Sequence, residues 1–322
     1  MIVLWRVTER CNYACGFCAH DRRLGGARHE TAADEALRFG RLLCDWGRAR
    51  GEPILLSWLG GEPLLWRPAL PVSRLLSASA GIRISATTNG STLHRPAVRD
   101  AVLDAFAELT ISVDAFAPGH DRLRGMNGAW HRARAGIMAL ANDRRARGAR
   151  LKLRANVVLM RATLPDFPDL CETLGDWGVD EITFNQLGGR DRPEFFPDQR
   201  LRPEDVAALA ACVPRLRARL AGRGILLCGD TRYLDRFRAS AAGEAIAVAQ
   251  CPLGASFLFV DTQGLIAPCS FSTADYGIPI ASLRTPADFE TLPARFAAAH
   301  AAARCAACGD CPSTQIFAKF AA

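Results

Sequence analysis

Apolar residues along this chain alternate between short, strand-like runs and longer segments with helical spacing. The strand-like runs cover residues 2–8, 53–59, 81–87, 108–113, 151–160 and 180–185. Helical spacing is found in residues 31–49, 95–106, 128–147 and 164–177. Strands that alternate with helices build βαβ units around a parallel sheet. The pattern therefore predicts an α/β fold, either an open sheet or a closed or partly closed barrel of six βα units, whose chemistry lies in the loops after the strands.

The pattern changes after about residue 200, which indicates a second, smaller region. The expected elements are a helix at 203–221, a short strand at 225–228, a β-hairpin with strands 256–260 and 265–269 around the turn 261–264, and an alanine-rich helix at 287–303. The segment 229–250 shows no clear period. We therefore expect two domains, residues 1–229 and 230–322.

Composition excludes several classes of protein. Of the 322 residues, 49% are apolar and 23% are charged, which is ordinary globular usage and not that of a disordered chain. No apolar run is long enough for a membrane helix. The N-terminal sequence MIVLWRVTER lacks the basic region and cleavage site of a signal peptide, so we expect a cytoplasmic protein. The net charge of +7 comes without a zinc finger, an aromatic–glycine RNA motif or a long basic tail, so we expect neither a nucleic-acid nor a membrane partner.

Cysteine spacing carries the strongest chemical signal. Of the 12 cysteines, three lie within eight residues near the start and five lie in the last 72 residues. Closely spaced cysteines in a long chain without an export signal indicate metal binding more than a disulfide framework. We expect the isolated Cys44, Cys171, Cys212 and Cys228 to be small buried apolar residues.

The first group is Cys11, Cys15 and Cys18, in the loop after the first predicted strand. Three thiolates at this spacing can hold an iron–sulfur cubane and leave one iron without a protein ligand. Zinc with His20 as fourth ligand remains an alternative, as do three unrelated cysteines.

These residues resemble the signature of the radical S-adenosylmethionine (radical SAM) enzymes, a C-x3-C-x2-C motif with an aromatic residue, Phe17, before its last cysteine. The similarity continues in order through Gly60-Gly61-Glu62-Pro63, Asn89 after the third strand, the Ser112-x-Asp114 segment and Asn156 in the fifth strand. The resemblance implies that S-adenosylmethionine binds a [4Fe-4S] cluster on the three cysteines. It also implies that the following residues contact S-adenosylmethionine: Phe17, Gly60, Gly61, Glu62, Asn89, Ser112, Asp114, Asn156 and Leu187.

The second group of cysteines resembles the SPASM/twitch extension of the same enzymes, which holds auxiliary [4Fe-4S] clusters. It consists of Cys251, Cys269 and the closing run Cys305, Cys308 and Cys311. The full SPASM pattern has seven cysteines, so five favour the twitch form with one auxiliary cluster, four ligands and one spare among the last three. A structural zinc knuckle is the alternative. With the resemblance, the expected fold is a partial (βα)6 TIM-like barrel with a small C-terminal α+β hairpin-and-helix domain of twitch/SPASM type.

The resemblance implies a radical SAM oxidoreductase: reductive cleavage of S-adenosylmethionine gives a 5′-deoxyadenosyl radical, which takes a hydrogen atom from the substrate. An auxiliary cluster that accepts the remaining electron would make net oxidation natural, and a flavodoxin- or ferredoxin-type protein is the expected reductant. The single-auxiliary-cluster layout is similar to 2-deoxy-scyllo-inosamine dehydrogenase-like members, so we expect dehydrogenation of a small polar metabolite, such as a sugar or aminocyclitol, in a biosynthetic pathway.

Two alternatives stay open: modification of a short ribosomal peptide by oxidative crosslinking or epimerisation, and a zinc-stabilised binding protein without catalysis. Ser270 follows Cys269 where sulfatase-maturating relatives carry an Asp, which argues against that activity. Candidates for a general base are Arg154, Asp230 and Asp261.

Two polar segments could contribute to the site. Residues 185–196 include Arg190, Asp191, Arg192 and Glu194, which could bind a hydroxylated substrate or form a solvated loop. Residues 20–22 follow the cysteine motif and could shape the cofactor side or simply start a helix.

Overall fold

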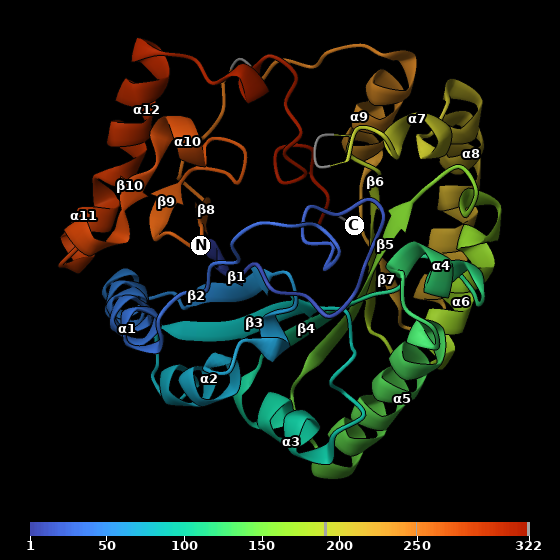
Figure 1. The fold of residues 1–322 in the computed structure, drawn as a ribbon, viewed down its shortest axis with the longest axis horizontal. Coiled ribbons are helices and arrows are strands. Elements are labelled where there is room, and N and C mark those ends of the chain that lie inside the picture. Colours follow the sequence, from blue (N-terminus) through green and yellow to red (C-terminus); the bar gives the residue numbers. More distant parts are fainter. Residues whose placement is uncertain (190–191, 249, 321–322) are drawn as a thin grey trace.

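The computed structural model describes residues 1–189, 192–248 and 250–320, and one mixed sheet runs through them (Figure 1). The sheet has ten strands in the order β10-β9-β8-β1-β2-β3-β4-β5-β6-β7. The strands are β1 (Ile2–Thr8), β2 (Ile54–Gly60), β3 (Ile82–Thr88), β4 (Glu108–Ser112), β5 (Lys152–Leu159), β6 (Glu181–Gln186), β7 (Leu226–Leu227), β8 (Phe257–Val260), β9 (Leu265–Ala267) and β10 (Ile278–Pro279). Neighbouring strands from β1 to β7 pair in parallel. The predicted α/β fold and its six strand-like runs are confirmed.

Helices cover the outer face of the parallel strands (Figure 1). The helices in the first half of the chain are α1 (Ala33–Arg50), α2 (Ala69–Ser77), α3 (Pro96–Ala105), α4 (Gly119–Arg124), α5 (Ala129–Arg147) and α6 (Phe167–Asp176). Then follow α7 (Phe196–Gln199), α8 (Pro203–Ala221), α9 (Thr231–Ala242), α10 (Thr273–Tyr276), α11 (Pro286–Glu290) and α12 (Leu292–Ala302). None of the helices in the described part of the chain is long and apolar enough to cross a membrane.

Successive side chains of β1 alternate between the two faces of the sheet. Val3, Trp5 and Val7 are fully buried, while Ile2 and Leu4 line a cavity on the inner side. Trp5 packs edge-on against Phe39 of α1, at a ring-centroid distance of 5.3 Å. Successive side chains of a strand point to opposite faces, so the same strand supplies the helix-facing core and the wall of the cavity.

The barrel is partial because β1 pairs with β8 on the side away from β2. This pairing is parallel, from Ile2 opposite Phe257 to Trp5 opposite Val260, and β8 then forms the predicted antiparallel hairpin with β9. The sheet thus continues from the first predicted domain into the second. The boundary at 229/230 stays a prediction.

The second half of the chain differs in two details from what its sequence pattern indicates. The segment without clear period contains α9, whose Tyr233, Leu234 and Phe237 are buried, and whose Asp230 side chain accepts a hydrogen bond from the Tyr233 amide at 3.1 Å. The arginines between these apolar residues hid the helical period. The single helix expected at 287–303 is instead α11 and α12, because Pro293 lies in the first turn of α12 and has no amide to continue α11.

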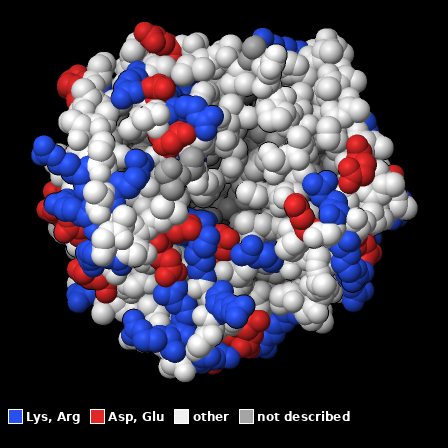
Figure 2. All heavy atoms as spheres, turned by 180° about the vertical axis from the view of Figure 1, so that it is seen from behind, with Lys and Arg blue, Asp and Glu red and all other residues white. Residues whose placement is uncertain are grey.

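Charge is mixed on the face seen from behind (Figure 2). Positive and negative side chains are interspersed there, and the surface is hollowed near its centre. This face therefore offers no broad patch of one sign of the kind that a polyanion would require.

Candidate functional site

The loop after β1 presents three cysteines whose sulfurs each accept hydrogen bonds from N–H groups. The Cys11 sulfur accepts one from the Tyr13 amide at 3.4 Å and one from Asn89 Nδ2 at 3.8 Å. The Cys18 sulfur accepts one from the His20 amide at 3.4 Å, and Arg124 Nη1 lies 3.9 Å from the Cys15 sulfur. Donors placed around sulfur stabilise the thiolate form, which is the form that binds metal.

The glycine pair after β2 lets another loop press directly against this cysteine loop. A Cβ on Gly60 would lie 2.2 Å from the Thr8 carbonyl oxygen, and one on Gly61 would lie 2.2 Å from that of Arg10. The amides of Gly61 and Glu62 donate to these same two oxygens at 2.8 Å. Any side chain at either glycine would push the two loops apart.

Glu62 ties the ends of β2 and β3 together. Its carboxylate is fully buried and accepts hydrogen bonds from the Thr88 hydroxyl at 2.6 Å, the Asn89 amide at 2.6 Å and the Leu64 amide at 3.0 Å. Burial raises the pKa of Glu62, while these three donors act in the opposite direction. Since a carboxylate has about four acceptor sites, roughly one remains for a bound group.

Asn89 continues the link to the cysteine loop. Its Nδ2 donates to Asn12 Oδ1 at 2.9 Å as well as to Cys11, and its Oδ1 accepts from the Ser91 amide. The glycine–glycine–glutamate turn after β2 and Asn89 after β3 are therefore both linked to the loop that carries Cys11.

The segment after β4 reaches the same loop through a buried ion pair. Arg124 Nη2 lies 2.7 Å from Asp114 Oδ2, and both side chains are almost completely buried. Gly125 has φ of 56°, and a Cβ there would lie 2.3 Å from the Ala14 carbonyl oxygen. The Ala14 amide in turn donates to the Arg124 carbonyl. Asp114 thus holds Arg124 in place beside Cys15.

The segment after β6 forms another wall of the site. Arg192 Nη1 lies 3.1 Å from Asp21 Oδ2, and Phe195 packs on Phe17 at a centroid distance of 6.0 Å. Arg192 also pairs with Glu194, whereas Arg190 and Asp191 lie outside the described residues. Residues 20–22 form a turn that does not start a helix.

Inside the barrel lies a cavity of about 440 Å³ lined by side chains of β1 to β6, by residues of and after β7, and by a segment near residues 314–320. Asn156 joins three other residues of this cavity: its Oδ1 accepts from Thr183 Oγ1 at 3.0 Å, from Asn185 Nδ2 at 2.9 Å and from Lys319 Nζ at 3.0 Å. With its oxygen saturated, the amide Nδ2 of Asn156 is the group left to donate to a ligand. Ser112 pairs with Asn156 across β4 and β5, and Leu187 is buried just after β6.

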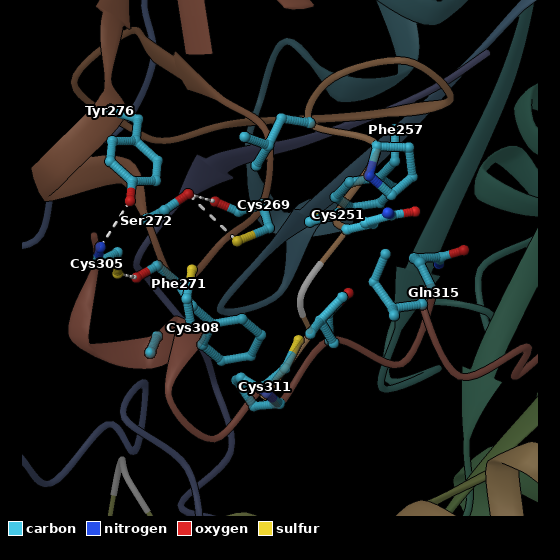
Figure 3. A pocket seen from close by; sticks show the side chains of 18 of the residues that line it. Cys251, Phe257, Cys269, Phe271, Ser272, Tyr276, Cys305, Cys308, Cys311 and Gln315 are labelled. Carbon is cyan, nitrogen blue, oxygen red and sulfur yellow. Dashed lines mark hydrogen bonds between the residues drawn. The ribbon is translucent and has the colours of Figure 1, made fainter. Parts of the chain in front are cut away.

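The five C-terminal cysteines line a second cavity, of about 320 Å³ (Figure 3). Cys269, Cys308 and Cys311 lie near enough to Cys251 for their charges, added to the larger effect of burial, to raise the pKa of the Cys251 thiol to about 11. The Cys305 thiol instead donates to the Phe271 carbonyl at 3.6 Å, and the Cys305 amide donates to the Tyr276 hydroxyl oxygen at 2.6 Å.

Residues 5–144 match the family model described as the Radical SAM superfamily. The chain carries a radical SAM domain. S-Adenosylmethionine and a [4Fe-4S] cluster are therefore its cofactors.

Curated relatives resemble this chain well beyond that domain. The AdoMet-dependent heme synthase of Methanosarcina barkeri is 25% identical over 84% of this chain and 76% of its own length. A PqqA peptide cyclase of Ruegeria pomeroyi is 28% identical over 68% of this chain and 57% of its own length. The chain spans only about half the length of two other relatives.

Among solved structures, Streptococcus suis SuiB superposes on 92% of this chain and 65% of its own, with a TM-score of 0.63 and 15% identity. At this identity the likeness supports the fold alone.

The residues present fit these cofactors. Thiols with N–H donors aimed at their sulfurs suit an iron–sulfur cluster. Burial raises the pKa of the Cys11 thiol to about 12, the Tyr13 amide acts in the opposite direction, and the positive charge of a bound metal would favour the thiolate further. Within the described ranges, no three His, Cys, Asp or Glu side chains converge on a site for a single metal ion.

The candidate bases lie apart from one another. Arg154 lines the barrel cavity, but its guanidinium pairs with Glu108 and Glu181. Asp230 caps α9, and Asp261 accepts the Gln263 and Leu265 amides in the turn between β8 and β9. Neither aspartate is among the residues that line the barrel cavity.

The structure also brings together residues that sequence reasoning missed. Thr183, Asn185 and Lys319 surround Asn156, and Tyr233 donates to Asn185 Oδ1 at 2.9 Å. The alternation of Thr183 and Asn185 in the sixth strand could have identified them as cavity-facing. Nothing in the sequence places Lys319 beside the fifth strand.

Proposed function

We propose that this radical SAM enzyme oxidises a small polar metabolite that binds inside the barrel, with a sugar or aminocyclitol as the expected class. The observation that carries this proposal is the polar wall of the 440 Å³ cavity, which includes Ser57, Ser85, Thr87, Thr110, Asn156, Thr183 and Asn185. Hydroxyl and amide groups suit a hydroxylated ligand, and the volume is at the lower end of the range for small-molecule sites.

In this proposal, Cys11, Cys15 and Cys18 hold the [4Fe-4S] cluster that binds S-adenosylmethionine. Glu62 supplies a carboxylate acceptor at the end of β2, and Asn156 supplies an amide donor from β5. Gly60 and Gly61 let the loop approach closely, Asn89 and Arg124 stabilise the cysteine sulfurs, and Asp114 positions Arg124. Phe17, Ser112 and Leu187 complete the expected wall.

The bound cofactors supply the one-electron chemistry that removes a hydrogen atom from a substrate C–H bond. The chain itself positions the substrate and keeps water away. The ion-paired layer of Glu108, Lys152, Arg154 and Glu181 closes the end of the cavity near the strand starts, and Asn156 lies nearer the strand ends. The substrate would lie between these two levels.

For the auxiliary cluster, we propose Cys251, Cys269, Cys308 and Cys311 as the four ligands. The support is the mutual proximity of their thiols, together with the separate hydrogen bond of the Cys305 thiol to Phe271. Cys305 would then be the spare cysteine. An auxiliary cluster makes an oxidation natural, with a flavodoxin- or ferredoxin-type reductant in the cytoplasm supplying the first electron.

Peptide modification is the second candidate, favoured by the similarity to PqqA peptide cyclases over 68% and 88% of this chain. The names of the relatives also include a heme synthase and a nucleotide dehydratase, so they do not single out one substrate class. The cavity is also lined by residues near the end of the printed sequence, Thr314, Gln315, Lys319 and Phe320, which leave less room for a peptide than for a small substrate.

The test uses anaerobically reconstituted enzyme with S-adenosylmethionine, a strong reductant and two panels of compounds. One panel contains deuterated sugars and cyclitols, and the other contains short peptides. We expect deuterium in 5′-deoxyadenosine and a ketone product only with the first panel. Deuterium transfer from peptides alone would contradict the small-metabolite proposal.

A further inference from the structure

The chain contains only two lysines, and both line the barrel cavity. Only Lys152 and Lys319 are lysines among the 40 lysine and arginine residues. Both line the barrel cavity, although they are 167 positions apart along the printed sequence. Elsewhere, the positive charges of the chain are arginines, which stay protonated at any pH the protein meets. A lysine amine differs because it can lose its proton and become an acceptor.

The two lysines have different surroundings. Lys152 Nζ pairs with Glu181 at 2.8 Å and with Glu108 at 3.7 Å, and its side chain is 38% exposed. Lys319 is 9% exposed, and its Nζ donates to Asn156 Oδ1 at 3.0 Å. Among the described residues Lys319 has no carboxylate within ion-pair distance. The two carboxylates that line the cavity, Glu108 and Glu181, pair with Arg154 and Lys152.

The neighbours of Lys319 fix the position of its amine. The Phe320 ring lies 5.3 Å from Lys319 Nζ and also covers Arg154, at 5.2 Å. Thr183 and Asn185 also donate hydrogen bonds to Asn156 Oδ1, so the oxygen that accepts the Lys319 hydrogen bond is fixed in position. The amine therefore lies beside the middle of β5, at the level of Asn156.

We propose that Lys319 faces the substrate and accepts the proton of its hydroxyl group during oxidation. In this step the substrate O–H bond breaks and a bond forms between the proton and the neutral amine, so one proton moves and no electron does. The proposal rests on the proposed function, and it narrows the substrate to one whose reacting carbon carries a hydroxyl group.

The electrostatic surroundings support a neutral amine before reaction. Burial, and then the charge of Arg154, lower the pKa of Lys319 to about 7, while Cys228 acts in the opposite direction. The other charged groups that share the cavity are Lys152, Glu108 and Glu181. A base whose pKa is close to the working pH is present in its accepting form and can still release the proton afterwards.

The first experiment measures this amine directly in the holoenzyme. Because the chain has two lysines, labelling with [13Cε]lysine gives two NMR signals, and the Lys152→Arg variant identifies the Lys319 signal. We expect that signal to titrate near pH 7, and binding of a hydroxylated substrate to move its midpoint. A midpoint near 10, the ordinary lysine range, would overturn the proposal.

The second experiment compares Lys319→Arg, which keeps the charge but cannot accept a proton, with Lys319→Met. We expect both to lower kcat/KM for the metabolite at least about 100-fold, the scale of lost general-base catalysis, and to abolish the rise of kcat/KM with pH near 7. S-Adenosylmethionine affinity and iron content should stay within twofold of the wild type. Wild-type kcat/KM in both variants would overturn the proposal.

The two proposals can fail separately. If no hydroxylated metabolite transfers deuterium to 5′-deoxyadenosine, the proposed function fails, and this use of Lys319 fails with it. If turnover is normal but the Lys319 signal titrates near 10, only the lysine proposal fails.

Discussion

The two cysteine groups are built in opposite ways. The N-terminal group spans eight residues of one loop, and segments after β2, β3 and β4 press onto that loop through Glu62, Asn89 and Arg124. The C-terminal group takes its cysteines from Cys251 to Cys311, and the hairpin of β8 and β9 and the residues after α12 bring them together. The first site is a short motif with tertiary support, whereas the second exists only once the chain has folded.

This difference matters for how each site responds to change. Loss of a proposed ligand in the first group should remove the place where the cofactor would react but leave the barrel. Loss of a proposed ligand in the second group should also remove a link between distant segments.

The largest effect is expected for Cys15→Ala. Removing one of three ligands should abolish reductive cleavage of S-adenosylmethionine and lower the iron content by about four atoms per chain. Anaerobic iron and sulfide assays with 5′-deoxyadenosine measurement test this, with Cys44→Ala as the control because Cys44 is a buried core residue. Cleavage at the wild-type rate would contradict the assignment of the first group.

In the second group, substitution of two nearby cysteines, Cys305 and Cys308, should have different effects on the iron content. Cys308→Ala should lose the auxiliary cluster, about four iron atoms, and with it product formation, while cleavage of S-adenosylmethionine continues. Cys305→Ala should keep about eight iron atoms per chain. If Cys305→Ala loses iron and Cys308→Ala keeps it, the proposed ligand set is wrong.

A smaller effect is expected from the buried ion pair behind the first group. Arg124→Gln leaves Asp114 charged and buried, which should lower the free energy of unfolding by about 3–5 kcal/mol. The double variant Arg124→Gln with Asp114→Asn should recover part of this loss, because neither charge remains. Anaerobic denaturant unfolding measures both, and equal stability of the single and double variants would contradict the role of the pair.

The smallest effect concerns pH and stability. Burial lowers the pKa of Lys319 to about 7 in the folded chain, below the unfolded value near 10.4, so the unfolded chain binds more protons between these values. The free energy of unfolding of the wild type should therefore rise from pH 7 to pH 9, by about 2 kcal/mol more than that of Lys319→Met. Parallel pH profiles of the two proteins would show that Lys319 does not titrate in this range.

Much of the fold could be predicted from the sequence because its parallel strands are apolar runs between amphipathic helices. β2, for example, covers Ile54–Gly60 against an expected 53–59, and α8 covers the expected 203–221. The prediction failed where arginines interrupt the apolar period, as in α9, and where a proline divides one apolar segment, as between α11 and α12.

The candidate site likewise has a part that the sequence predicts and a part that only the fold decides. The three N-terminal cysteines and the glycine–glycine–glutamate turn could be recognised from the sequence alone. Their members are only a few residues apart, so the backbone itself keeps them close in space. Tertiary structure alone decided that Arg124 lies beside Cys15, that Cys305 turns to Phe271, and that Lys319 meets Asn156 across 163 positions. These contacts join residues far apart in the chain, and their positions follow from strand order and packing, which no short stretch of sequence encodes.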